Sequence, residues 1–339
     1  MMRCKLLLVF AVVAVVAHSH DAFCQYPDFL TSPVELEREF VENFSFTSAA
    51  FSPDGDRIAL GALDEVPRLF DSATGQELGQ LTEGQEPGDV VGWLSDIVVL
   101  RTNTLIWLKS LTTQEVLGEQ EFFAIYGTAT LPETKEVWAV VPPRAVFRWN
   151  TVQDTTMQRS FNIGAYAPPG MASDPEVSSA AFSLDGSRFA IVVEDNSGFT
   201  DLERGGHGVE VRHSETTTLL RSIRIEEAWG GDARSVALSR NGSSVFVELS
   251  TGEIRQFDVA TGEHLNNFLG GAPHALSPDD GLLITKRSSQ STALSDPATG
   301  ELIMGWTANG PYEFSHDSRR LLIHNTIFEI GGAREISLG

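Results

Sequence analysis

The stretch Glu194–Gly208 holds the side chains whose types best fit metal chemistry. Asp195, Asp201 and Glu203 offer carboxylate oxygens, and Ca²⁺ takes about six to eight oxygen ligands in proteins. His207 could join these carboxylates around a softer metal. The spacing matches no EF-hand loop, and solvated carboxylates on a surface loop are the alternative. We therefore predict no cofactor, with Ca²⁺ as the weaker alternative.

Two further stretches without a strand pattern flank this one along the chain, at Asn162–Val177 and Ile225–Ala233. Connections longer than about 12 to 15 residues in a compact domain are usually functional or disordered. Trp229 could anchor a partner or fill space between sheets. Acidic, glycine-rich surface loops without a ligand are the alternative for all three stretches. The side chains predicted to contact a partner are Tyr166, Met171, Asp174, Phe199, Arg204, His207, Glu226 and Trp229.

A repeated unit of about 38 residues, with insertions, must position these stretches. Each unit contains four short runs with strand-like alternation, which we name strands A to D in chain order. In the first unit these runs are 48–51, 57–61, 67–70 and 77–81. The units align on Phe51, Trp93, Thr130, Phe182, Leu238, Leu276 and Phe314.

The turns between the predicted strands repeat as well. Asp or Asn caps local backbone amides in such turns, and Gly accepts the positive φ that a tight hairpin needs. The A-to-B turn reads Ser-x-Asp/Asn-Gly at 52–55, 183–186 and 239–242, and the C-to-D turn reads Asp-x-Ala-Thr-Gly at 71–75, 258–262 and 296–300.

The residue before each aligned position is small in six of the seven units. Where sheets radiate from an axis, their innermost strands converge and leave room for small side chains only. A closed ring also leaves few free sheet edges. The sequence therefore predicts an all-β fold, a seven-bladed β-propeller of four-stranded antiparallel blades. The column consists of Ala50, Gly92, Ala129, Ala181, Ala237, Ala275 and, as the exception, Glu313.

Glu313 is a second candidate site residue because a carboxylate in this column should be partly buried. Its ionised form is costly there unless it is paired, and Arg319 or Arg320 in the same unit could supply the partner. In a functional role Glu313 would face the central channel. In a structural role it would mark a looser last blade.

Alternating strand directions separate the connections of a blade onto two faces. We call the face with the D-to-A and B-to-C connections the loop face, and the face with the A-to-B and C-to-D turns the turn face. All three long stretches belong to the loop face and flank the fourth unit. The sequence therefore predicts a binding site on this sector.

The chain resembles WD40-type β-propellers, particularly exported bacterial members, over roughly residues 45–339. The resemblance rests on the Ser-Pro-Asp-Gly turn, on Phe70-Asp71 and Phe257-Asp258 at the end of strand C, and on the Ala-Thr-Gly turns that follow. The family's Gly-His pair before strand A is absent, and Trp-Asp does not occur, which brings the blades closer to YVTN or quinoprotein-like propellers. The resemblance implies a fold and a tendency to bind partners, but no chemistry.

The N-terminus has the pattern of a secretory signal. Arg3 and Lys5 precede the apolar run Leu6–Ala17, and a polar segment follows. We predict a signal peptide at 1–24, an N-terminal segment at 25–44 and the propeller at 45–339, so that the mature protein is secreted or periplasmic. The last blade could be closed by a strand at 36–40 or by one at 335–338.

Charge and composition limit the partners. The formal net charge of −22 repels phosphate backbones, so nucleic acid is not expected. No apolar run approaches the roughly 20 residues that span a bilayer. Cys4 and Cys24, the two cysteines, lie in or beside the signal, so the mature chain has no disulfide to stabilise it. We expect a monomer that binds a protein or a small ligand.

The function predicted from these observations is that of a non-catalytic, exported binding or scaffold propeller. Motifs for a serine nucleophile elbow, a zinc protease, a phosphate loop and a Cys-x-x-Cys pair are absent from the sequence. The alternative is an enzyme with a site at the channel mouth. It would be a metal-dependent, lactonase-like hydrolase or a quinoprotein-like dehydrogenase, and would need carboxylates and histidine converging at the axis.

Overall fold

The structure is a computed structural model, and its described residues form part of one compact unit, Pro33–Gly339. The described residues are 34–39, 46–62, 66–82, 87–131, 134–141, 145–152, 158–162, 176–195, 206–225, 231–288, 291–307, 310–323 and 326–330.

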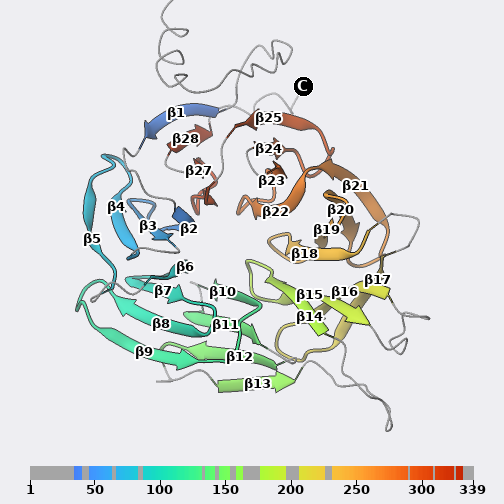
Figure 1. The fold of residues 1–339 in the computed structure, drawn as a ribbon, viewed down its shortest axis with the longest axis horizontal. Coiled ribbons are helices and arrows are strands. Elements are labelled where there is room, and N and C mark those ends of the chain that lie inside the picture. Colours follow the sequence, from blue (N-terminus) through green and yellow to red (C-terminus); the bar gives the residue numbers. More distant parts are fainter. Residues whose placement is uncertain are drawn as a thin grey trace, which may run out of the picture. The chain divides into compact units, whose positions relative to one another are not determined.

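Seven four-stranded antiparallel sheets are arranged in a ring around a common centre, as Figure 1 shows. Six sheets are built from consecutive strands, so strands A to D of each blade follow one another from the axis outwards. The predicted seven-bladed β-propeller is therefore confirmed. Blade 1 contains β2 (Phe46–Phe51), β3 (Arg57–Ala62), β4 (Arg68–Asp71) and β5 (Glu77–Gln80); blade 2 contains β6 (Asp89–Leu94), β7 (Ile97–Arg101), β8 (Leu105–Ser110) and β9 (Val116–Glu121); blade 3 contains β10 (Gly127–Leu131), β11 (Glu136–Val141), β12 (Ala145–Asn150) and β13 (Gln158–Asn162).

Blades 4 to 6 follow the same order along the chain, and blade 7 combines strands from both ends of the described chain. Blade 4 contains β14 (Glu176–Phe182), β15 (Arg188–Asp195), β16 (Gly206–His213) and β17 (Leu219–Arg224); blade 5 contains β18 (Ala233–Leu238), β19 (Ser244–Leu249), β20 (Glu253–Asp258) and β21 (His264–Leu269); blade 6 contains β22 (Gly271–Leu276), β23 (Leu283–Ser288), β24 (Ser291–Ser295) and β25 (Leu302–Trp306); blade 7 contains β26 (Tyr312–Phe314), β27 (Arg320–Ile323), β28 (Thr326–Ile330) and β1 (Val34–Glu39).

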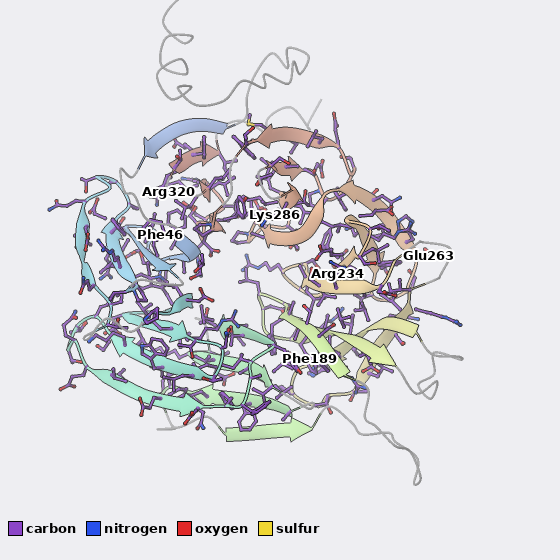
Figure 2. All side chains as sticks on the ribbon, viewed as in Figure 1. Phe46, Phe189, Arg234, Glu263, Lys286 and Arg320 are labelled. Carbon is purple, nitrogen blue, oxygen red and sulfur yellow. The ribbon has the colours of Figure 1, made fainter. Side chains whose placement is uncertain are left out.

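In the blades whose outer strand has described side chains, burial falls from the second strand to the outer strand. Every residue of β11 is buried, because both faces of this strand pack against neighbouring blades. The outer strand β5 instead alternates between half-buried and exposed residues. Continuous apolar runs are expected for strands covered on both faces, and alternation for strands with one wet face. Figure 2 shows side chains filling the spaces between neighbouring blades.

The A-to-B turns are held by a repeated hydrogen-bond pattern. In blade 1, the Ser52 hydroxyl donates to Asp54 Oδ1 at 2.5 Å and accepts the backbone N–H of Arg57 at 2.9 Å. Gly55 takes a φ of 76°. The Ser52 hydrogen bond is the main cause of an Asp54 pKa below its usual value. The pattern repeats at Ser183, Ser239, Ser277 and Ser315.

The column of small residues lies on the axis, as predicted. All seven of its members line one central cavity. The fit is tight at Gly92, where an added Cβ would come within 2.2 Å of Thr130 Oγ1 on the next blade. Small side chains at these positions therefore allow the inner strands to approach one another.

The ring closes through β1, which pairs antiparallel with β28 from Val34↔Ile330 to Glu39↔Thr326. This pairing selects the N-terminal alternative for the closing strand, while 335–338 lies outside the described residues. Arg320 links blade 7 to blade 1: its guanidinium donates to Ser72 Oγ at 3.1 Å and lies 5.7 Å from the centre of the Phe51 ring.

Gly92→Ala should destabilise the protein by about 1 to 3 kcal/mol, because the new methyl group overlaps Thr130 and overpacks the junction of blades 2 and 3. Urea unfolding measures the loss. Gly305→Ala is the matched control: its Cβ would lie 3.6 Å from Thr292 O, an ordinary contact. Adding Thr130→Ala to Gly92→Ala should recover most of the loss. Equal stabilities for the two alanine variants would contradict this account of the axis.

Candidate functional site

The predicted loop of blade 4 is shorter than the sequence suggested. We predicted a B-to-C loop over Glu194–Gly208, but β15 and β16 pair as far as Asp195↔Gly206. The connection between these strands is therefore 196–205. Pairing continues beyond the apolar run because it satisfies backbone N–H and C=O groups whatever the side chains are.

Most of the predicted partner and metal residues lie outside the described residues, and their roles stay predictions. Two exceptions have a described backbone: Asp195 ends β15, and His207 pairs with Glu194 one register position away. The described residues contain no group of three or more His, Cys, Asp or Glu side chains placed to hold a metal ion. Outside the description are Tyr166, Met171, Asp174, Phe199, Asp201, Glu203, Arg204, Glu226 and Trp229.

The long connections around blade 4 leave their strands on the loop face. They join β13 to β14 (163–175), β15 to β16 (196–205) and β17 to β18 (225–232). The first two are the longest connections between the strands of the ring. Because β14 to β17 alternate in direction, the strand ends of blade 4 at which these three connections begin or end lie on one face of the blade.

Phe123 is a residue of the loop face that sequence reasoning missed. Its side chain is 92% exposed, and it lies between β9 and β10, on the link from blade 2 to blade 3. Its neighbour Phe122 packs edge-on against Phe147, with ring centres 4.9 Å apart. The pair of adjacent aromatic residues was the available signal, because neighbouring side chains in an extended segment point in opposite directions.

A second candidate site is the axial cavity, which has a volume of about 280 Å³. It runs from the column of small residues to the A-to-B turns, so it reaches the turn face. Leu184, Arg240, Pro278 and His316 contribute to its wall from the turns of blades 4 to 7. Glu313 projects from the column of blade 7.

Arg240 ties the turns of blades 5 and 6 together at the rim of this cavity. Its guanidinium donates to the Pro278 carbonyl at 2.9 Å, and its backbone N–H donates to Asp280 Oδ1 at 2.6 Å. Burial raises the pKa of Asp280, although Arg240 opposes the shift. Burial, reinforced by the charge of Arg240, lowers the pKa of His316. This shift favours the neutral form of His316.

Glu313 is half-buried, and burial raises the pKa of its carboxyl to about 8. No cation or hydrogen-bond donor among the described residues offsets this shift. The predicted pairing with Arg319 or Arg320 was wrong for Arg320, whose guanidinium reaches across to Ser72 of blade 1. Arg319 is exposed and forms no ion pair with Glu313 within the described structure.

The ring of seven four-stranded sheets defines the chain as a seven-bladed β-propeller. No known protein family matches its sequence. Among solved structures, it is similar to the β-propeller domain of Cps50 (Swd1) from Myceliophteria thermophila, with a TM-score of 0.65 and 14% identity. That similarity covers 85% of this chain and 97% of the other. At this identity it shows the fold alone. A helix long and apolar enough to cross a membrane is absent from the described part of the chain.

Stability should fall with rising pH between about 5 and 8 through Glu313, because the folded chain keeps a proton that the unfolded chain has lost. The slope is at most about 1.4 kcal/mol per pH unit. Glu313→Gln removes this titration, so the variant should gain stability over the wild type progressively up to pH 8. Urea unfolding across this range measures the difference. Glu329→Gln, an exposed carboxyl in β28 of the same blade, is the control. A constant difference between Glu313→Gln and the wild type would contradict the buried titration.

Proposed function

We propose that this protein is an exported, non-catalytic β-propeller that binds a protein partner through the loop face at blades 3 and 4. The observation that carries the proposal is the 92% exposure of Phe123 on that face. Exposed aromatic side chains are frequent anchors of interfaces. Burying a phenylalanine side chain in a partner would contribute about 1.5 to 3 kcal/mol.

The connections near Phe123 also favour the loop face at blades 3 and 4 as the binding surface. Its link enters blade 3, and the longest connection, 163–175, leaves blade 3 on the same face towards blade 4. The B-to-C connections of the other blades have two to five residues, whereas that of blade 4 covers 196–205. Long connections on a rigid scaffold are common positions for binding residues. The similarity to the Cps50 (Swd1) propeller domain is compatible with a scaffold role but supports only the fold.

Photo-crosslinking in the cell that produces the protein tests which face binds. A crosslinking amino acid at position 123 should give a discrete protein adduct, and one at position 152 should not. Val152 is the matched control because it is 69% exposed and lies in the C-to-D turn of blade 3, on the opposite face. The same adducts from both positions, or none at 123, would contradict the proposal.

Phe123→Ala should then weaken binding of the identified partner by about ten- to a hundred-fold, the loss expected for an anchor residue worth 1.4 to 2.8 kcal/mol. Val152→Ala should leave the affinity unchanged. Both variants should unfold at the wild-type temperature, because neither side chain packs in the core. Calorimetry with the purified partner measures all three affinities. Turnover of a substrate by the purified protein would favour the enzyme alternative.

The export part of the proposal rests on Arg3, Lys5 and the apolar run Leu6–Ala17. In a secreting host, the mature N-terminus should follow Ala17, Ser19 or Cys24, and the mass of the purified protein measures it. Replacing Val12 and Val13 by Asp should interrupt the apolar run and leave the uncleaved protein inside the cell. Retention of residues 1–24 on the secreted wild type would contradict a cleaved signal.

A further inference from the structure

The axial cavity on the turn face contains a carboxyl group whose presence the fold does not require. Six of the seven inner strands place Ala or Gly at the equivalent position, so a small residue would also satisfy the packing of blade 7. The seventh, Glu313, lines the cavity instead. The packing of the column therefore does not explain why blade 7 has a carboxyl group at this position.

Glu313 also lacks the partners that a structural carboxyl has elsewhere in the same protein. Glu136 in blade 3 is 4% exposed, and it accepts hydrogen bonds from Trp138 Nε1 at 3.0 Å and from the Arg148 guanidinium. Glu313 forms no such hydrogen bond or ion pair with the described residues. Buried carboxylates are normally paired because desolvation of the charge is costly. The Glu313 carboxyl is thus left available to a ligand in the cavity.

We propose that the axial cavity binds a small organic cation, an amine with a short apolar body, and that Glu313 is its counter-ion. A cationic group within hydrogen-bond distance of Glu313 would supply the missing partner. The wall around it presents alanine methyl groups and side chains such as Phe182 and Leu238, which suit an apolar body. The net charge of −22 favours the approach of cations from solution.

The other charged groups of the cavity leave this role to Glu313. At the rim, the backbone N–H of Arg240 donates a 2.6 Å hydrogen bond to Asp280. The positive charge of Arg240 and the carboxylate of Asp280 offset each other there. Partial burial and the charge of Arg240 lower the pKa of His316, which favours its neutral form. A divalent metal is disfavoured as the ligand, because the described residues offer no cluster of three metal-binding side chains.

Binding should be coupled to release of a proton. Burial holds the pKa of Glu313 near 8 in the free protein, so the carboxyl is largely protonated at pH 7. An ammonium group favours the ionised form and displaces this proton to solvent. The affinity should therefore rise about tenfold from pH 6 to pH 7, about fivefold from pH 7 to pH 8, and level off above. The pKa of His316 lies below its usual value, which disfavours a competing positive charge on this side chain.

Titration calorimetry with n-butylammonium and tetramethylammonium tests the proposal on the full mature chain. Either probe should bind one site at pH 8.5, with affinity falling about fivefold from pH 8 to 7. At pH 7, the heat should change with the ionisation enthalpy of the buffer, because a proton is released. n-Butanol and butyrate, which have similar apolar bodies without a positive charge, should bind at least tenfold more weakly.

Two variants separate the site from the fold. Glu313→Gln keeps the size of the side chain but removes the charge, and it should lose binding while keeping a cooperative thermal transition. Glu329→Gln, on the exposed surface of the same blade, should bind like the wild type. The proposal is overturned if neither ammonium probe binds at pH 8.5, if Glu313→Gln binds equally well, or if n-butanol matches n-butylammonium.

Discussion

Crowding at the axis is the constraint on which the rest of this structure depends. Seven inner strands can approach a common centre only if the side chains between them are small, and Gly92 shows how narrow the tolerance is. The strands that follow spread outwards, so a second strand such as β11 is buried along its whole length, whereas an outer strand such as β5 alternates between half-buried and exposed residues. Position in the ring therefore sets which residues are apolar and where connections are free to vary.

The architecture could be predicted because the same pattern of short strands and turns recurs in seven units of the sequence. The turn at 52–55 and the alanine column each combine a short motif with a fixed place in the unit, and the structure shows both as expected. In blade 6, however, the fourth position of the A-to-B turn is not glycine, so a turn motif that requires glycine there misses this turn. There Asp280 takes the positive φ of 59° and Ser277 still holds the turn.

The sequence pattern could not predict which side chains contact each other between blades. Arg320 lies seven residues after Glu313, which suggested an ion pair within blade 7, but its guanidinium lies on blade 1. The length of the β15–β16 hairpin was also missed, since backbone pairing extends through Glu194 and Asp195 without an apolar pattern. For the candidate sites, Glu313 was found because it breaks a column. Phe123 was missed because it lies in a connection, where it does not depart from any aligned column of the repeat.

Closure by β1 has a consequence for the order of events in folding. The pair Val34↔Ile330 joins residues almost a whole chain apart, whereas the strands of blades 1 to 6 pair with close neighbours. Contacts of such large sequence separation form late, because the entropy of closing the loop must be overcome first. Blades 1 to 6 can assemble as the chain emerges, but the final sheet must wait for its last strand. Until β1 pairs with β28, the molecule is thus an open arc with two unpaired ends.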